Sequence, residues 1–599
     1  MDHSFTLKPA RARLRPSTML AIALAVLLTA AWTYRAWVPL SMLRLPDNDD
    51  MMRLAEVRDW LNGQAFSDLL QHRLGPPGGA SMHWSRLADL GPAAIIAALT
   101  PMVGRPHAEL AMVVLYPGLL LLATLLIGAR LAERLAPRAG PAAVILLALS
   151  FPMTSLFVPG RIDHHALQIL LIMIFAERLV ARARWRAGLG AGVAAALSLV
   201  IGLETLPLVL FGMGALFWRF VVDTPDVARP RLGGFALGLG GTTLTAFWLL
   251  RPQVWPDQWC DGFTPASMGA TLIAAAYFAL LAMGAPMLRD GRYRTAAGAG
   301  LALAALPLVL RTSSVCLRGP YGAMDPMLQD LWMSRVGEAV GLFAQDSVGM
   351  TISYGGLVLA GLVALLWLLR DGAWRSPKWQ SLAILLIPAI LLCIVQIRAT
   401  YTVSALVAIP LAVAVHRIRR STRSILVRVG IWVVAAGVTY DAAGVWFDRA
   451  TASPIIAARQ TVSQCTSGAA FAELRKLPPG LVMAPLDSAA YVIGATQMRS
   501  VGAPYHRNNS GNVALYRFFL GGEAQARAIA AQWRVDYVML CQSSFAELGP
   551  AMTRDHRRMV GLLLDGRAPG WLTPLPGIAG GPMVFAVQRD GLSDAPSTH

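Results

Sequence analysis

Long apolar segments recur along almost the whole chain, and this repetition restricts the fold more than any other feature. A helix needs about 20 mostly apolar residues to cross the hydrocarbon core of a bilayer. Only 14% of the 599 residues are charged, whereas soluble domains carry about a quarter. We therefore predict a polytopic α-helical membrane protein with about thirteen spans, at about 18–38, 111–131, 140–159, 165–181, 187–203, 205–221, 232–250, 266–288, 294–312, 350–370, 379–397, 400–416 and 425–446.

The basic residues indicate an orientation rather than a nucleic-acid partner. They outnumber the acidic residues by 52 to 34, but the arginines lie mostly in short loops and not on one soluble face. If every segment spans, the clusters share the side of the basic N-terminal tail, as in the cytoplasmic loops of inner-membrane proteins. We expect a bacterial inner-membrane protein with a cytoplasmic N-terminus and an uncleaved first helix. The clusters are Arg130/Arg134/Arg138, Arg182/Arg184/Arg186, Arg229/Arg231, Arg289/Arg292/Arg294, Arg370/Arg375/Lys378 and Arg417/Arg419/Arg420/Arg423.

An odd number of spans places the remaining loops and the C-terminus in the periplasm. We predict a membrane domain at 1–447, with long outer loops at 39–110 and 313–349. The composition changes after Trp446, and residues 448–599 suffice for one soluble domain. Short buried strands at 481–484 and 535–540, with a helical pattern between them, indicate an α/β class.

Four cysteines lie on the predicted outer side. Cys260 and Cys316 are in loops, whereas Cys465 and Cys541 are in the soluble domain. An oxidising compartment allows each pair to form a disulfide. Four free thiols remain the alternative.

The first outer loop opens with Asp47-Asn48-Asp49-Asp50, and Arg53 follows. Three carboxylates in four residues repel one another, and a divalent cation relieves that repulsion. Aspartates at this point also cap helices. The sequence leaves open whether Asp47 or Asp49 is the catalytic carboxylate of this loop.

A second polar motif follows the third segment, where Arg161-Ile162-Asp163-His164-His165 forms a short outer turn. Asp163 and His165 point the same way if this turn is extended. A mixed carboxylate and imidazole set suits Mn²⁺, Mg²⁺ or Zn²⁺. We predict a metal site formed by Asp49, Asp163 and His165.

Two further charged residues are expected on the same face. Arg398 lies in a very short outer turn and is a candidate phosphate clamp, with an interfacial anchor as the alternative. Glu338 lies in the outer loop 313–349, which is a candidate lid. Ordinary surface charge explains Glu338 about equally well.

In this order the motifs resemble the catalytic subunit of oligosaccharyltransferase, a GT-C glycosyltransferase that uses polyprenyl-phosphate-linked sugars. Members of that family have about thirteen spans and a soluble outer domain. Archaeal members carry a motif similar to Asp163-His164-His165, followed by a Glu where this chain has Gln168. The segments 494–502, Tyr505-His506-Arg507-Asn508 and Asp536-Tyr537-Val538 resemble the region after the family's signature motif.

The chain departs from the family at that signature. Pro485-Leu486-Asp487-Ser488-Ala489 stands in place of WWDYG, so only the Asp is retained. The recognition of an Asn-x-Ser/Thr acceptor is therefore not implied.

The resemblance implies transfer of a sugar or oligosaccharide from a polyprenyl-(di)phosphate donor to a periplasmic protein, lipid or glycan, with Mn²⁺ or Mg²⁺ as cofactor. Alternatives are a GT-C monoglycosyltransferase that acts on lipopolysaccharide or polysaccharide, and a transporter of polyprenyl-linked sugars, which would show inverted repeats. The candidate catalytic residues are Asp47, Asp49, Asp50 and Glu338, and the candidate substrate-binding residues are Arg53, Arg398, Asp487, Tyr505, His506 and Arg507.

Overall fold

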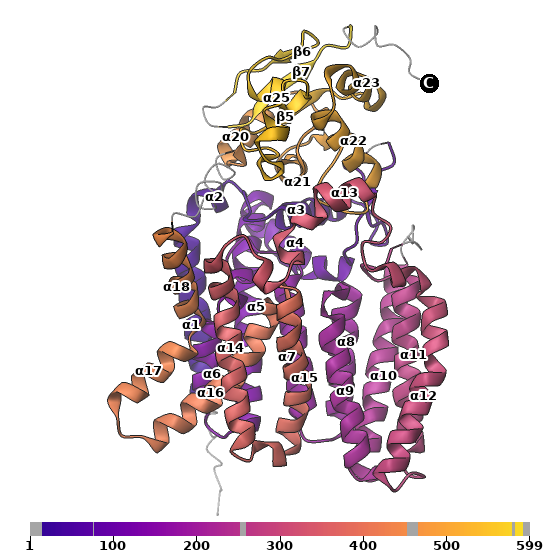
Figure 1. Cartoon of the computed structure of the whole chain (residues 1–599), viewed down its shortest axis with the longest axis vertical. Coiled ribbons are helices and arrows are strands. Elements are labelled where there is room, and N and C mark those ends of the chain that lie inside the picture. The colour runs from indigo at the N-terminus through magenta and orange to yellow at the C-terminus, as the bar shows by residue number, and fades with distance from the viewer. Residues whose placement is uncertain (1–14, 76, 252–258, 452–464, 578–580, 591–599) are drawn as a thin grey trace, which may run out of the picture.

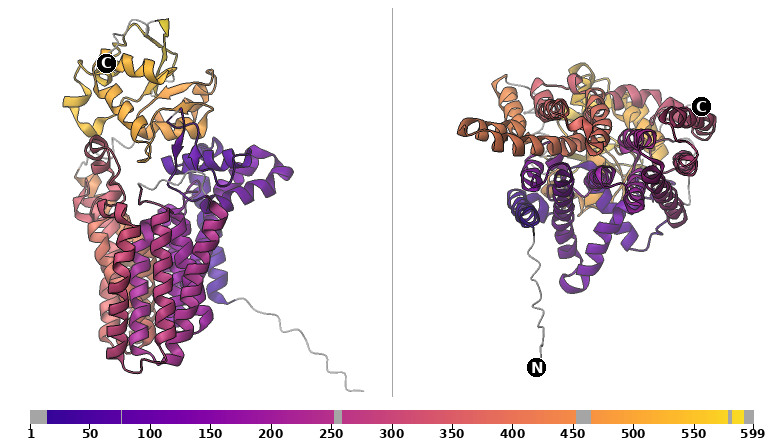
Figure 2. Two further views of the ribbon diagram at one scale, coloured as in Figure 1. Left: turned by 90° about the vertical axis from the view of Figure 1, so that its right-hand side faces the viewer. Right: turned by 90° about the horizontal axis from the view of Figure 1, so that it is seen from below.

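A computed structural model describes residues 15–75, 77–251, 259–451, 465–577 and 581–590. The basic tail before Arg15 lies outside the described residues. A bundle of long helices carries a smaller domain with a β-sheet at one end (Figure 1). Figure 2 shows the segment that follows the first long helix beside that domain, above the same end of the bundle.

The bundle confirms the predicted polytopic helical class. Within the described residues, nine helices are long and apolar enough to cross a membrane, and one bent pair is a tenth candidate. The three other predicted segments form shorter helices that pack among the long ones, namely α6 (Gly140–Ala148), α7 (His165–Val180) and α8 (Trp185–Ile201). The nine are α1 (Pro16–Arg35), α5 (Arg105–Leu135), η3 with α9 (Leu203–Val222), α10 (Pro225–Leu250), α11 (Pro265–Gly284), α12 (Gly291–Thr312), α14 (Val348–Arg370), α15 (Pro377–Val395) and α16 (Ala399–Ser421).

The last predicted segment differs from a simple span. It forms α17 (Ile425–Ala435) and α18 (Gly437–Ala450), which are bent by 71° relative to each other. At the break the amide of Val438 donates to the carbonyl of Leu149 at 2.9 Å. The Tyr440 hydroxyl donates to the carbonyl of Val434 at 2.8 Å. These contacts satisfy backbone groups that a continuous helix would have paired internally.

Small residues bring α8 and α10 into close contact. A Cβ atom on Gly192 would overlap the carbonyl oxygen of Phe235, and one on Gly238 would overlap that of Leu189. In lipid, such spacing of small residues allows helix backbones to approach closely.

Two outer segments lie between the bundle and the β-sheet domain. The first contains α2 (Trp37–Ser41), α3 (Asn48–Leu61), the antiparallel pair β1 (Leu70–Gln71) and β2 (Ala80–Ser81), η1 (Arg86–Asp89) and α4 (Leu90–Val103). The second contains η4 (Ser314–Arg318), α13 (Pro326–Leu331), η5 (Met333–Arg335), η6 (Gly337–Ala339) and η7 (Leu342–Ala344).

The C-terminal region has the predicted α/β character. Its sheet has the order β4-β3-β5-β7-β6, in which β3 is parallel to β4 and β5, and β7 is antiparallel to β5 and β6. The predicted domain boundary at 447/448 stays a prediction. The strands are β3 (Leu481–Met483), β4 (Arg499–Ser500), β5 (Tyr537–Leu540), β6 (Leu572–Pro574) and β7 (Met583–Val587), and the helices are α20 (Gly468–Leu474), α21 (Leu486–Ala495), α22 (Asn509–Leu520), α23 (Glu523–Trp533), η9 (Ala546–Leu548), α24 (Pro550–Thr553) and α25 (Met559–Leu564).

This domain is bonded to the first outer segment. Arg58 donates to the carbonyl of Gly494 at 2.7 Å, and Arg73 donates to the carbonyl of Ile493 at 2.8 Å. The amide of Gly75 donates to the carbonyl of Ser500 at 2.9 Å. The end of α21 and the edge strand β4 are thus tied to the polypeptide that carries the acidic cluster.

Both cysteine pairs that the sequence left open are joined in the structure. Cys260–Cys316 connects the segment before α11 to η4, and Cys465–Cys541 connects the start of the described C-terminal region to the end of β5. Cys393 is a buried free thiol in α15.

Candidate active site

A cavity of about 770 Å³ lies between the outer end of the bundle and the β-sheet domain. Its wall includes both outer segments, the turn before α7, η3, the turn before α16 and loops that follow β3 and β5. Most of the predicted charged residues therefore converge on one space, although their positions extend from the first outer segment to the C-terminal domain.

Two of the three clustered aspartates shape the site. Asp47 caps α3 by accepting from the amide of Asp49 at 3.2 Å, and it also accepts from Arg161 at 2.7 Å. Asp50 is fully buried, and its Oδ1 accepts from the amides of Ile162 and Asp163 at 2.8 and 2.9 Å. Burial raises the pKa of Asp50 to about 7, although the charge of Arg161 opposes this shift.

Asp49 differs from both of its neighbours. Its carboxylate lines the cavity and has no hydrogen bond or ion pair within the described part of the chain. Burial, followed by the charges of Asp163 and Asp47, raises its pKa well above the usual value. Of the two candidates that the sequence left open, Asp49 is the one whose carboxylate is not used by its neighbours.

The turn before α7 holds a compact group of possible metal ligands. One ligand atom from each of Asp163, His164 and His165 lies within 4.8 Å of the others. Nε2 of His165 lies 3.3 Å from Oδ2 of Asp163, and that buried oxygen has no hydrogen-bond donor among the described residues. An unsatisfied carboxylate oxygen beside an imidazole fits a divalent metal. Asp49, the third predicted ligand, lies outside this group.

His164 has a different environment from His165. Its Nδ1 lies 2.5 Å from Oδ1 of Asp163, and its Nε2 lies 3.3 Å from Oε1 of Glu204. Burial lowers the pKa of His164, but these two carboxylates outweigh burial and raise the pKa to about 9. His164 thus lies between the carboxylates of Asp163 and Glu204, and its Nδ1 is also 3.3 Å from Nη2 of Arg53.

Arg53 lies behind the cavity wall. The side chain is fully buried, 2.8 Å from Asp89 and 3.8 Å from Asp163. Its guanidinium lies 4.5 Å from the ring centroid of Trp84. The structure places Arg53 beside Asp89 and Asp163 and not among the residues that line the cavity, and its predicted role in substrate binding stays a prediction.

Arg398 and Glu338 are brought together at the membrane end of the cavity. Nε and Nη2 of Arg398 donate to Oε2 of Glu338 at 3.1 and 2.8 Å. The Tyr401 hydroxyl lies 3.4 Å from the other carboxylate oxygen. Both charged side chains line the cavity, so η6 of the second outer segment is tied to the turn before α16.

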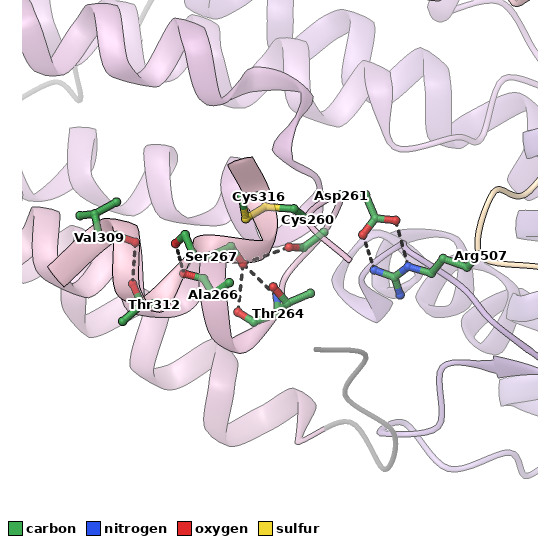
Figure 3. The surroundings of a disulfide bond; sticks show 11 residues. Cys260, Asp261, Thr264, Ala266, Ser267, Val309, Thr312, Cys316 and Arg507 are labelled. Carbon is green, nitrogen blue, oxygen red and sulfur yellow. Dashed lines mark hydrogen bonds and ion pairs between the residues drawn. A yellow bond between two sulfur atoms is a disulfide. The ribbon is translucent and has the colours of Figure 1, made fainter. Parts of the chain in front are cut away.

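The candidate substrate-binding residues of the C-terminal domain fall into two groups. Some line the cavity, and others contact the outer segments on which the domain rests. Asp487 and His506 line the cavity, whereas the Tyr505 hydroxyl donates to the carbonyl of Asn48 at 3.3 Å. Arg507 donates to both carboxylate oxygens of Asp261 at 2.9 and 2.6 Å, next to the Cys260–Cys316 disulfide (Figure 3). Asp487 is accessible within the cavity, yet desolvation and the charge of Asp47 raise its pKa.

Sequence reasoning missed two carboxylates of this region. Glu204 lines the cavity and contacts His164, and its Oε2 also accepts from Gln168 at 3.1 Å. The signal for Glu204 was a carboxylate near Pro207, at a break between two apolar segments. Asp261 forms ion pairs with both His506 and Arg507. The one feature of the sequence that could have drawn attention to Asp261 was its position beside Cys260.

The chain thus has the fold of a polytopic helical membrane protein with a polar cavity beneath an outer α/β domain. In this fold it is similar to the oligosaccharyltransferase of Archaeoglobus fulgidus. The apo form of that protein gives a TM-score of 0.63 at 16% identity, over 97% of this chain and 75% of that one. Its complex with an inhibitory peptide and a dolichol-phosphate gives 0.65 at 16% identity, with the same coverage.

A third structure of that archaeal protein, in complex with Zn and sulfate, gives a TM-score of 0.58 at 16% identity, over 95% of this chain and 73% of that one. No known family profile and no curated protein match the chain. At this identity the likeness establishes the fold, and it confirms the resemblance that the sequence motifs indicated.

Proposed function

We propose that the chain is an integral-membrane glycosyltransferase that moves a sugar or oligosaccharide from a polyprenyl-(di)phosphate to an acceptor on the side of the C-terminal domain. The observation that carries this proposal is the unpartnered carboxylate of Asp49 in a cavity that also presents His165 and Arg398. A lipid-linked donor requires such a site at the membrane surface, because its tail stays in the bilayer.

We assign the binding of the donor phosphate to Arg398. This residue lies in the turn between α15 and α16, where a phosphate attached to a membrane-embedded chain would enter the cavity. Its guanidinium provides paired N–H donors for phosphate oxygens and stabilises the charge that develops on the leaving group. Glu338 orients Arg398 through two hydrogen bonds.

Asp163 and His165 would hold a divalent cation such as Mn²⁺ or Mg²⁺, and the Asp49 carboxylate faces the same cavity. When bound, such a cation would act as a Lewis acid and stabilise the negative charge on the phosphate oxygens. Asp50 fixes the backbone of Asp163, and Arg53 holds its carboxylate from behind. These contacts keep the site in one geometry before substrates bind.

Asp49 is assigned to the acceptor, which it orients or deprotonates as a general base. Asp487 lies in the wall on the side of the C-terminal domain. Because Asp487 is the only residue of the WWDYG signature that remains, the acceptor is taken more broadly as a protein, lipid or glycan. The Archaeoglobus fulgidus protein has been solved with an acceptor peptide that contains an NVT sequon.

The test follows release of polyprenyl phosphate from a polyprenyl-linked sugar by mass spectrometry, with purified protein in nanodiscs and envelope extract as the source of acceptor. We expect release to require Mn²⁺ or Mg²⁺ and to fall more than about 100-fold in Asp163→Asn and His165→Gln. Glu473→Gln, which changes an exposed carboxylate of the C-terminal domain, is the matched control. The product mass distinguishes monophosphate from diphosphate donors.

If the polyprenyl-linked sugar crosses the membrane of liposomes that contain the protein, and no polyprenyl phosphate is released, the proposal is overturned in favour of a transporter. Release that is unchanged in both site variants would overturn the assignment of the site. A modified lipopolysaccharide or polysaccharide among the products would identify the monoglycosyltransferase alternative.

A further inference from the structure

A second hollow lies at the end of the bundle opposite the C-terminal domain. Its volume is about 230 Å³, and it is formed by the beginning of α6, the end of α16 and α17. Figure 1 shows α17 leaving the bundle at this end. The hollow is thus remote from the candidate active site.

Four arginines line this hollow, namely Arg138, Arg419, Arg420 and Arg428. The wall contains no Asp or Glu among the described residues, and none of the four has an ion pair there. Arg417, in the same turn region of α16, is paired with Asp371 at 2.7 Å and does not line the hollow. The described residues thus gather positive charge at this hollow without an acidic residue in its wall.

The backbone at Arg138 is also unusual. This residue has a φ of +68°, in the left-handed region that residues other than glycine rarely adopt. It lies in the short turn between α5 and α6, and its side chain lines the hollow. This turn therefore contributes one of the four arginines from outside α16 and α17.

Apart from His416, the rest of the wall is apolar. It consists of Pro141, Ala142, Ile145, Val415 and Trp432, and the guanidinium of Arg419 lies 5.6 Å from the Trp432 ring centroid. On α17, Leu426 and Val429 are 81% and 55% exposed, as expected for a helix in contact with lipid. A ligand with an anionic head and an apolar tail matches this combination.

We propose that this hollow binds the phosphate headgroup of an anionic phospholipid. Basic pockets between helices at a membrane surface recognise such headgroups by charge, and a tryptophan at the interface packs beside the glycerol and acyl region. Inorganic phosphate shares the headgroup chemistry but lacks the tail, so it is the competing source. This inference does not depend on the proposed transferase activity.

The test measures lipid retention by native mass spectrometry of the full chain. Protein is exchanged into micelles with phosphatidylglycerol or phosphatidylcholine, in parallel with inorganic phosphate alone. We expect selective retention of phosphatidylglycerol and about fivefold weaker binding for each arginine removed in Arg420→Gln and Arg428→Gln. Arg138→Gln provides a third variant that leaves α16 and α17 unchanged.

The matched control is the double variant Arg289→Gln/Arg292→Gln. These arginines lie at the turn between α11 and α12, on the same end of the bundle but outside the hollow. Equal loss of lipid in the control and the hollow variants would overturn the proposal, because net charge alone would then explain retention. Full competition by inorganic phosphate at millimolar concentration would assign the hollow to a free anion and overturn the lipid assignment.

Discussion

At the scale of single residues, Asp49 and Asp50 are adjacent on the first turn of α3 but occupy different environments. Asp50 accepts two backbone hydrogen bonds from the turn before α7, whereas the Asp49 side chain has no partner within the described residues. Two identical side chains at neighbouring positions therefore have different surroundings. The Asp50 carboxylate is bonded to the backbone of the site, whereas the Asp49 carboxylate faces the cavity.

The first prediction separates the roles of these two carboxylates. Asp50→Ala leaves two buried amides without an acceptor and is expected to lower the free energy of unfolding by about 1–3 kcal/mol. Asp49→Ala is expected to leave the unfolding midpoint unchanged while abolishing sugar transfer. Thermal unfolding in detergent and the transfer assay are measured on the same preparations. Equal destabilisation by both substitutions would contradict this division.

The sequence located the residues of the site that are close together along the chain. Asp163 and His165 lie in one short turn, so their proximity was evident from spacing. The pairing of Arg53 with Asp89 was not evident, because it depends on how η1 packs against α3. The contact of Glu204 with His164 likewise joins elements whose relative placement the sequence pattern does not specify.

At the scale of elements, the segment before α11 connects the bundle to the C-terminal domain. Asp261 is buried there, and its carboxylate forms ion pairs with His506 and Arg507 of that domain. Burial alone would raise its pKa, but the hydrogen bond from His506 and the charge of Arg507 hold the pKa well below the usual 3.8. The ionised carboxylate therefore stabilises the folded state.

The second prediction follows from the sign of this shift. Since the folded pKa is lower than the unfolded pKa, the stabilisation by Asp261 is complete above about pH 5 and is lost as the pH falls below about 4. Asp261→Asn should lower stability by about 1.5–3 kcal/mol at neutral pH. The difference in unfolding midpoint between wild type and variant, followed by tryptophan fluorescence, should shrink with acid. A difference that is constant from about pH 7 to pH 3 would contradict this account.

Helices were more predictable than their connections. The apolar segments gave the long spans because bilayer thickness sets their length. The bend between α17 and α18 was not predictable, since it depends on the contact of Val438 with Leu149, which is far away in the sequence. The strands β3 and β5 were recognised as short apolar runs, whereas the two-residue strand β4 has too little pattern to identify.

At the scale of the whole molecule, two independent features indicate one orientation. The arginine clusters lie at helix ends and in the loops between them, at the end of the bundle opposite the C-terminal domain. Both disulfides lie at the other end, beside the cavity. Positive loops are retained in the cytoplasm, and disulfides form in oxidising compartments. Both features agree with the orientation predicted from the sequence, in which the cavity and the C-terminal domain lie in the periplasm, and this orientation stays a prediction.

The third prediction tests this orientation with single cysteines. Glu473→Cys introduces a thiol on α20 of the C-terminal domain, and Arg292→Cys introduces one at the opposite end, in α12. The native cysteines give little background, because four are in disulfides and Cys393 is buried. In spheroplasts an impermeant maleimide should label the first variant and label the second only after permeabilisation. The reverse pattern would place the cavity in the cytoplasm, where a reducing environment would also leave both disulfides open.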